Sequence, residues 1–503
     1  MYFGRKKKFI PVFMLTVLLI SFFFNSYRLT AYAATLDEIM AEVEARKLLP
    51  IQSDETENWP AGPEIGAQAA ILMDANTGVI LYAKNIHERL YPASTTKIMT
   101  ALLAIENGSL DDMVTFSREA VFSVPGDGSN MGMDAGEAIP LEECLYGILV
   151  ASANEVANAV AEHISGSIDE FVNMMNERAA ELGCTDTHFV NTNGLHDDDH
   201  YTSAYDLALI ATQFFQNEML CKISNTSQYH FEATATQPDD FYKNNKHRLV
   251  TGEIPYEGII GGKTGYTDTS RQTLVSCAEQ NGMKLICVIL KEESPAQFTD
   301  TVELFNYGFQ NFQILNIAES EDKYNMDSTN FFNADYDIFG NSKPILSIDT
   351  HSYVIVPNMA DFSDLDSTIN YDLTSGDLNN DADKKHIAQI KYSYNGVYVG
   401  ETYVNLLEYA KSESFFTSES PDTTDISVER TESAAPAEDK NTIFINVKNV
   451  LIGILIFAAV IICLFIIRAI IISKDIELRR RNRLKRKKHR RERISSGFDD
   501  FDF

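Results

Sequence analysis

The chain has 503 residues, 45% of them hydrophobic, which is enough for two or three domains with a sizeable core. Its formal net charge of −30 gives a surface that repels the phosphate backbone, so no nucleic-acid partner is expected. Six cysteines are too few for a disulfide scaffold.

Residues 1–33 have the three parts of a secretory signal peptide. Three lysines, Lys6 to Lys8, precede an apolar stretch from Phe9 to Phe24, and residues 31–33 form a small-x-small cleavage motif. An uncleaved signal anchor is the alternative. Both interpretations send the following chain across a membrane.

Residues 34–63 predict a short N-terminal segment, with one helix over 36–48 followed by a polar linker. Beyond it the pattern changes. Apolar runs at 69–73 and 79–83 flank a group of turn residues, which predicts a β-hairpin. A folded domain is therefore expected from residue 64 onward.

This domain is expected to extend to residue 312. Helical periodicity dominates from residue 94 to 215, and a second hairpin is predicted over 274–290 around an Asn-Gly pair. Strands, then helices, then strands indicate an α/β (α+β) domain. In it, an antiparallel sheet is packed by helices and carries a helical subdomain.

The five cysteines outside the C-terminal apolar segment are expected to be free, buried thiols. In the second hairpin, Cys277 faces Ile286, and Cys287 points to the other face of the sheet. A bridge between these two cysteines is therefore disfavoured.

The remaining chain predicts four segments. Short β-rich runs over 313–409 predict a small C-terminal all-β domain. Residues 410–442 are polar and poor in large apolar side chains, which is typical of a disordered tether. Residues 450–472 predict one transmembrane helix, and 473–503 form a basic tail. The positive-inside rule puts this tail in the cytoplasm and the folded domains outside the cell membrane. For the tail, contact with anionic lipid headgroups is favoured over RNA binding.

A serine and a lysine three residues apart, Ser94 and Lys97, stand at the start of the first helical segment. Pro92 favours a helix that opens here, and residues three apart share a helix face, so Lys97 can reach the Ser94 hydroxyl. A serine becomes a good nucleophile when a base takes its proton. A lysine is such a base only when burial or another cation keeps it neutral. Taken alone, the motif is a weak signal, because most such sequences are ordinary amphipathic helix starts.

Two further motifs carry chemistry. Ser152 can relay a proton and Asn154 can hold a substrate carbonyl, although a serine here is also typical of a helix cap. Before the second hairpin, Lys263 offers a positive charge and Thr264 a hydroxyl donor, and Gly265 would let a substrate approach the strand backbone. The alternative for this motif is a Gly-rich loop, or an incomplete phosphate-binding loop.

In this order, the three motifs are the signature of penicillin-binding proteins and class A β-lactamases. The chain from Met73 to Phe309 resembles more closely the low-molecular-mass D-Ala-D-Ala carboxypeptidases, serine peptidase family S11. The stretches that carry this resemblance are Met73–Gly78, Tyr91–Thr100, Ser152–Ala159, Phe189–Leu195, His200–Leu209 and Gly262–Thr267. Residues 313–409 look like the C-terminal β domain of that family.

The resemblance implies a serine-type D-Ala-D-Ala carboxypeptidase. Such an enzyme removes the terminal D-alanine of peptidoglycan stem peptides through an acyl-serine and binds β-lactam antibiotics, without a cofactor or metal. By resemblance, Ser94 is the nucleophile, Lys97 its base, and Ser152 part of the proton relay. The residues that it implies for substrate binding are Asn154, Lys263, Thr264, Gly265 and Tyr266. It also implies an oxyanion hole made by the backbone N–H groups of Ser94 and Tyr266.

Some features depart from the family or leave alternatives. The family often anchors through an amphipathic helix, whereas this chain predicts a full membrane span. Residues 245–249 match the family only in part, so they receive no role. The cluster His196–His200 is interpreted as a solvated loop, because adjacent residues cannot easily converge on one metal ion. A β-lactamase and a catalytically weak wall-binding scaffold remain the rival functions.

Overall fold

The structure is a computed structural model that describes residues 36–126, 128–321, 346–373 and 384–407. The predicted signal peptide, tether, transmembrane helix and basic tail all lie outside these described residues. Within the described ranges, no helix has both the length and the apolar character needed to cross a bilayer. Residues 122–128 fall outside the unit to which the other described residues belong.

A five-stranded antiparallel sheet, in the order β2-β1-β9-β8-β7, forms the centre of the main domain. Its strands are β1 (Ala69–Asp74), β2 (Ile80–Lys84), β7 (Ile259–Thr267), β8 (Arg271–Gln280) and β9 (Met283–Glu292). Both predicted hairpins are present, as β1–β2 and β8–β9. At the second turn, Asn281 and Gly282 have φ of 51° and 82°, the left-handed values that a two-residue hairpin loop requires.

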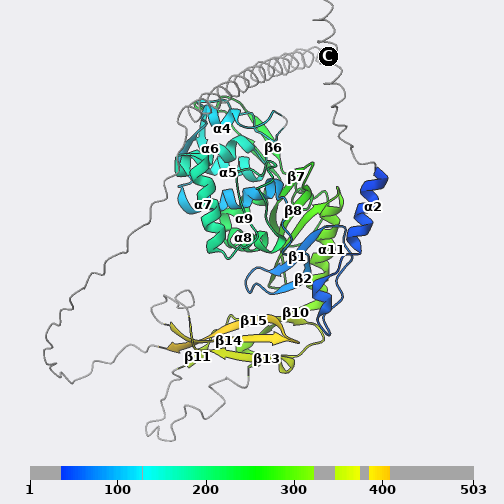
Figure 1. Ribbon diagram of the computed structural model, residues 1–503. Helices are drawn as coiled ribbons and strands as arrows, with labels where there is room; N and C mark the ends of the chain where they lie inside the picture. Colours follow the sequence, from blue (N-terminus) through cyan, green and yellow to red (C-terminus); the bar gives the residue numbers. More distant parts are fainter. Residues whose placement is uncertain (1–35, 127, 322–345, 374–383, 408–503) are drawn as a thin grey trace, which may run out of the picture. The chain divides into compact units, whose positions relative to one another are not determined.

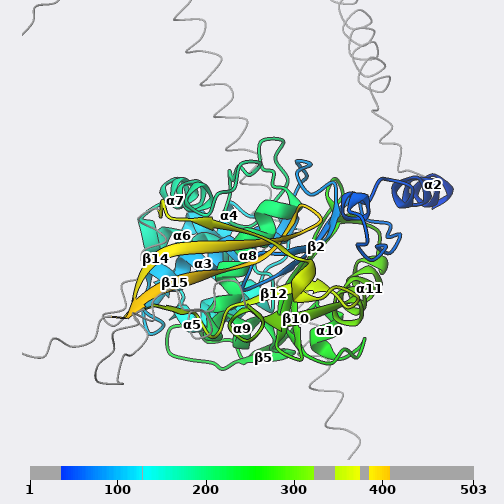
Figure 2. The same cartoon turned by 90° about the horizontal axis from the view of Figure 1, so that it is seen from below.

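Helices cover both faces of this sheet (Figure 1). On one face α11 packs closely, because Gly308 has no side chain to collide with Leu72 and Leu285. On the other face lies a group of helices around α3 (Figure 2). The α3 residues from Lys97 to Ala104 are all buried. A helix that is buried on every side belongs to a core. The expected α/β architecture, an antiparallel sheet packed by helices, is therefore confirmed.

The helices of the main domain vary in length from single turns to four turns. The longer ones are α3 (Lys97–Asn107), α5 (Leu141–Leu149), α6 (Asn154–Ser165), α7 (Ile168–Glu181), α8 (Ala204–Gln216) and α11 (Ala296–Asn311). The shorter ones are η1 (Gln52–Glu55), η2 (Ala93–Thr96), α4 (Arg118–Phe122), α9 (Glu218–Ser224) and α10 (Arg248–Thr251). Two small hairpins complete the domain, β3 (Met113–Thr115) with β4 (Ala138–Pro140), and β5 (Gln228–Phe231) with β6 (Phe241–Asn244).

The C-terminal domain is a second antiparallel sheet, in the order β10-β12-β15-β14-β13, with β11 paired to β15. Its strands are β10 (Phe312–Asn316), β11 (Leu346–Ile348), β12 (Tyr353–Pro357), β13 (Asp366–Asn370), β14 (Lys384–Tyr394) and β15 (Val397–Leu407). Two short turns, α12 (Ile317–Ser320) and η3 (Phe362–Asp364), connect them. The expected C-terminal sheet domain is therefore present.

The turn between β1 and β2 contacts this second sheet. The Asp74 carboxylate is buried and accepts hydrogen bonds from the backbone N–H groups of Asn76 and Thr77. The Tyr353 hydroxyl also donates to Asp74 Oδ1, at 3.1 Å, and accepts from Asn76 Nδ2, at 2.9 Å. Tyr398 donates to the carbonyl of Thr77 at 3.3 Å. The turn at residues 74–78 thus both closes the β1–β2 hairpin and joins the two domains.

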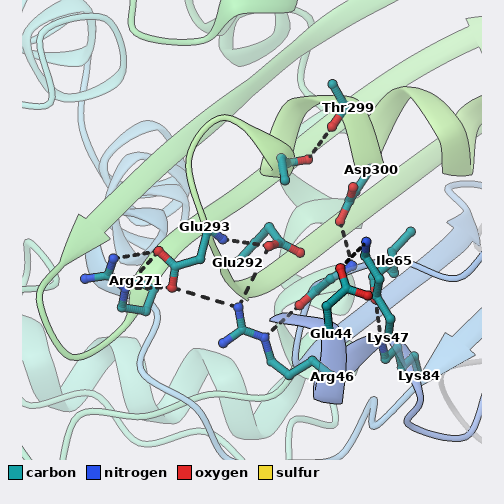
Figure 3. A network of polar contacts seen from close by, with 12 residues as sticks. Glu44, Arg46, Lys47, Ile65, Lys84, Arg271, Glu292, Glu293, Thr299 and Asp300 are labelled. Carbon is teal, nitrogen blue, oxygen red and sulfur yellow. Dashed lines mark hydrogen bonds and ion pairs between the residues drawn. The ribbon is translucent and has the colours of Figure 1, made fainter. Parts of the chain in front are cut away.

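The N-terminal helix α2 (Leu36–Lys47) is attached to the main domain through Arg46, which is only 6% exposed. Arg46 Nε donates to the Gly66 carbonyl at 2.7 Å, and its Nη2 lies within 4 Å of Glu292 and Glu293 (Figure 3). In the linker that follows, Trp59 is buried and donates to the Leu81 carbonyl at 2.9 Å. Packing therefore begins well before residue 64.

All five cysteines in the described residues are free, as expected. Cys277 pairs with Ile286 and Cys287 with Ser276, which confirms the predicted register. Burial was predicted for all five. It holds for Cys144, Cys277 and Cys287, whereas the other two are half-buried.

Candidate active site

Ser94 lies on η2, a single turn that precedes α3. The sequence predicted one α-helix that opens directly after Pro92. In the structure, helical backbone does start at Ala93, but residues 93–96 form a 3-10 turn whose first residue has a left-handed φ of +49°, and the α-helix begins only at Lys97. Ser94 therefore stands on a tight turn and Lys97 on the first residue of the helix proper.

The Lys97 amine lies among three oxygen atoms. Its Nζ is 3.2 Å from Ser94 Oγ, 2.6 Å from Asn154 Oδ1 and 2.6 Å from the backbone carbonyl of Asn193. The amide and carbonyl oxygens can only accept hydrogen bonds. A neutral amine has two N–H groups, and donating both to these oxygens leaves its lone pair for the Ser94 hydroxyl. The geometry suits a base that takes the serine proton.

The electrostatic surroundings of Lys97 favour this neutral form. Burial lowers its pKa well below the ordinary value, and the neighbouring charges of Lys263 and Lys246 lower it further. The buried carboxyl of Glu155 acts in the opposite direction. Desolvation disfavours the charged form of an amine, so the largest cause is the burial of the side chain itself.

Ser152 lies between α5 and α6, and Asn154 is the first residue of α6. Ser152 is buried with φ of +57°, which non-glycine residues adopt rarely and mostly where surrounding structure enforces it. It is not a helix cap, since α6 is preceded by Ala153. The backbone N–H of Asn154 donates to the Ser129 carbonyl at 2.9 Å, which fixes the start of α6.

Lys263 reaches the same place from strand β7. Its Nζ donates to Ser152 Oγ at 3.0 Å and to the Thr264 carbonyl at 2.7 Å. Burial, with a contribution from Lys246, lowers the pKa of Lys263 to about 7. Hydrogen bonds therefore form two groups in this site: Lys97 with Ser94 and Asn154, and Lys263 with Ser152.

The next three residues of β7 differ in their surroundings. Thr264 is half-buried, and its hydroxyl has no protein partner among the described residues. Tyr266 is 48% exposed. The sequence assigned Gly265 to close approach of a substrate, but a Cβ built on Gly265 would lie 2.8 Å from Ser94 N and 3.0 Å from the Pro92 carbonyl. This geometry indicates that the glycine also lets β7 pack against the turn that carries Ser94, and its role in substrate approach stays a prediction.

Lys246 is a site residue that the sequence did not identify. It lies just after the β5–β6 hairpin, and its Nζ donates to Ser129 Oγ at 2.9 Å. Its charge lowers the pKa of both Lys97 and Lys263. The sequence feature that could have identified Lys246 is the stretch 245–249, but it matches the family only in part and was therefore assigned no role.

The His196–His200 cluster is only in part the solvated loop that the sequence predicted. Residues 196–199 are exposed, but His200 is 2% exposed. Its ring lies 2.8 Å from the Thr96 hydroxyl on η2, so it belongs to the wall of the site. A five-residue pattern cannot reveal this, because the partner is distant in sequence. Among the described residues, no three His, Cys, Asp or Glu side chains are grouped to hold a metal ion.

Comparison with known proteins agrees with this geometry. The model of the peptidase S11 family, D-alanyl-D-alanine carboxypeptidase, matches residues 55–294. The chain is 36% identical over 253 residues to D-alanyl-D-alanine carboxypeptidase DacF of Bacillus subtilis, a match that covers 49% of this chain and 63% of that protein. It is 31% identical over 264 residues to D-alanyl-D-alanine carboxypeptidase DacB2 of Mycobacterium tuberculosis, covering 50% of this chain and 86% of that protein.

The fold is also that of a solved structure. Penicillin binding protein 5 from Haemophilus influenzae superposes with a TM-score of 0.54 and 24% identity, over 69% of this chain and 98% of that one. At this identity the likeness shows the fold alone. The sequence relatives go further, because one of them is more than 30% identical over most of its length. The chain belongs to the S11 family of D-alanyl-D-alanine carboxypeptidases.

Proposed function

We propose that this chain is a serine-type D-Ala-D-Ala carboxypeptidase that removes the terminal D-alanine of peptidoglycan stem peptides. The observation that carries the proposal is the position of Lys97. Its amine is buried, lies 3.2 Å from Ser94 Oγ, and donates to two oxygens that only accept. A neutral lysine held against a serine hydroxyl is the arrangement that a serine acyltransferase without a histidine base requires.

The reaction begins when Lys97 Nζ takes the Ser94 proton while Ser94 Oγ bonds to the carbonyl carbon of the penultimate residue. The peptide C–N bond then breaks. The leaving nitrogen takes a proton, for which Ser152 is the relay, and free D-alanine departs. Water next attacks the acyl-serine ester, the ester C–O bond breaks, and Ser94 recovers its proton. The N–H groups of Ser94 and Tyr266 bind the oxyanion in both halves.

Substrate recognition is assigned to β7. A terminal carboxylate fits the Lys263 charge and the Thr264 hydroxyl, since charge-assisted hydrogen bonds are strong in a site that excludes water. An extended peptide would lie along this strand in β fashion, held at its other side by the Asn154 amide. A β-lactam antibiotic carries a carboxylate and a strained amide in the same arrangement. Because its leaving group stays attached, the acyl-enzyme persists.

The test is release of D-alanine from a peptide ending in D-Ala-D-Ala by the full-length chain in detergent. Ser94→Ala should abolish both this release and covalent labelling by a fluorescent penicillin. Rapid turnover of penicillin without peptide cleavage would favour a β-lactamase instead. A folded chain that does neither would favour a wall-binding scaffold.

We also propose that the enzyme works at the outer face of the cell membrane, anchored by residues 450–472. The supporting features are the signal-like residues 1–33, the apolar span and the basic tail after it. Protease added to intact cells should remove the folded domains and leave a small C-terminal fragment. Digestion of the tail from outside would contradict this orientation.

A further inference from the structure

The peptide group between Ala93 and Ser94 is held in place by contacts to its carbonyl oxygen. The Ala93 oxygen accepts a hydrogen bond from Thr96 Oγ1 at 2.8 Å. It also rests against Gly194, where an added Cβ would overlap it. Ala93 is held in a left-handed conformation that an alanine rarely adopts on its own, so these contacts must keep it there.

Thr96 is in turn hydrogen-bonded to His200, and the direction of this hydrogen bond is fixed. The N–H of Val190 donates to His200 Nδ1 at 3.1 Å, so that nitrogen carries no proton. His200 Nε2 must then donate to Thr96 Oγ1, 2.8 Å away, which leaves the threonine proton for the Ala93 carbonyl. Burial lowers the pKa of His200 to about 3, so the ring stays neutral at physiological pH.

The other end of the same peptide group is the Ser94 N–H. A trans peptide is planar, so its carbonyl oxygen and its N–H point in opposite directions, and fixing one fixes the other. Ser94 N lies next to Gly265 on β7, beside Tyr266. The carbonyl end is therefore held by Thr96 while the N–H end meets the strand of the proposed substrate site.

We propose that Thr96 and His200 are positioning residues that orient the Ser94 N–H of the oxyanion hole by holding the Ala93 carbonyl. This inference rests on the proposed function. Both side chains are buried and act only through the backbone. They should therefore affect stabilisation of the tetrahedral intermediate and leave ground-state binding of the peptide unchanged.

The experiment measures kcat and KM for D-alanine release by the full-length chain, in two pairs of variants. Thr96→Val removes the hydroxyl at nearly constant shape, whereas Thr96→Ser keeps it. His200→Leu removes both ring hydrogen bonds, whereas a His200→Gln amide can accept from Val190 and donate to Thr96. Loss of one oxyanion donor costs a factor of about 100 or more in kcat, so a misdirected donor should cost at least about 10-fold.

We expect kcat to fall at least about 10-fold in Thr96→Val and His200→Leu, with KM within about twofold of wild type. Thr96→Ser and His200→Gln should recover most of the loss. Affinity for a peptidyl boronic acid, which forms a tetrahedral adduct with serine, should fall in parallel with kcat.

The matched control is Thr301→Val on α11. Thr301 is fully buried, and its hydroxyl donates to the Gln297 carbonyl at 2.7 Å. Thr301→Val therefore also removes a buried hydroxyl hydrogen bond, but on the other face of the sheet. An equal fall in kcat in this control would show a general loss of stability and overturn the proposal. Wild-type kcat in folded Thr96→Val would overturn it too. If Thr96→Val does not fold, the two His200 variants decide: equal kcat values in His200→Leu and His200→Gln would overturn the proposal. A wild-type chain that releases no D-alanine would instead refute the proposed function itself.

Discussion

At the scale of single residues, the proposed mechanism depends on the protonation of two buried lysines. Lys97 must be neutral to accept the Ser94 proton, whereas Lys263 must be charged to hold a carboxylate. Both amines have lowered pKa values because both are buried, and each has only a few oxygen partners. The same desolvation therefore helps one lysine and works against the other.

This opposition predicts the pH dependence of kcat/KM, which reports the free enzyme. The rate should rise with pH as Lys97 loses its proton. It should fall again near pH 7 and above, as Lys263 loses its charge and the carboxylate binds less well. Arginine stays charged at every accessible pH, so Lys263→Arg should remove the falling limb. The measurement is peptide cleavage by wild type and variant across a pH series.

The companion variant is Lys97→Arg, which keeps the charge but cannot supply a neutral base. Penicillin acylation should slow at least about 100-fold, the contribution of a positioned general base. Near-normal acylation of this variant would move the base to another residue. A falling limb that persists in Lys263→Arg would assign it to a different group.

At the scale of elements, local patterns predicted the strands and helices, but not how they meet. The Asn-Gly turn at 281–282 specifies its hairpin from nearby residues alone. The left-handed Ala93, by contrast, is held by Gly194 and Thr96, and only the folded chain brings Gly194 next to it. Gly265 was expected to let a substrate approach the strand, which stays a prediction, and in the structure its missing side chain also makes room for the turn at Ser94. The motifs therefore predicted which residues meet, and left open the backbone that orients them.

The packing of α2 against the main domain is a second feature that local sequence patterns did not predict (Figure 3). Arg46 reaches a buried acidic group formed by Glu292, on β9, and Asp300, on α11. Burial and the neighbouring Asp300 raise the pKa of Glu292 to about 8. The family match begins at residue 55, so α2 lies outside it. The N-terminal segment is thus part of the folded structure here, although its sequence suggested only a helix and a linker.

The raised pKa of Glu292 predicts a pH-dependent stability. Folded Glu292 keeps its proton to higher pH than the unfolded side chain, whose pKa is about 4.5. The folded state therefore binds more protons between these values, and the free energy of unfolding should fall as pH rises from 4.5 to about 8. Glu292→Gln has no proton to lose, so its stability should change less over this window. Denaturant unfolding at several pH values measures both, and identical slopes would contradict the assignment.

At the scale of the whole molecule, the two sheets share polar contacts and apolar packing. Tyr353 on β12 bonds to the buried Asp74, and Val354 and Val356 pack in one core with Leu72 and Leu81. None of the residues assigned to the active site lies in the second sheet. The C-terminal domain is therefore expected to contribute to stability more than to chemistry.

Tyr353→Phe tests this division of roles. It removes the hydroxyl bonded to Asp74 and Asn76, so the free energy of unfolding should fall by about 1–2 kcal/mol. The rate of penicillin acylation should stay within about twofold of wild type. Tyr371→Phe is the control. Because Tyr371 is exposed, removing its hydroxyl should leave the free energy of unfolding unchanged. A large loss of acylation in Tyr353→Phe would mean that the second sheet helps to shape the site.

The order of strands in the main sheet has a consequence for the way this chain folds. β1 lies inside the sheet, and its partner on one side is β9, with Ala69 opposite Leu290. A chain synthesised from its N-terminus therefore presents the β1–β2 hairpin early, with one edge unpaired until β9 arrives. Closing so long a loop is slow, and an open apolar edge invites pairing with other chains. Pairing of the last strand, β9, rather than formation of the first hairpin, should therefore set the rate of folding of this sheet.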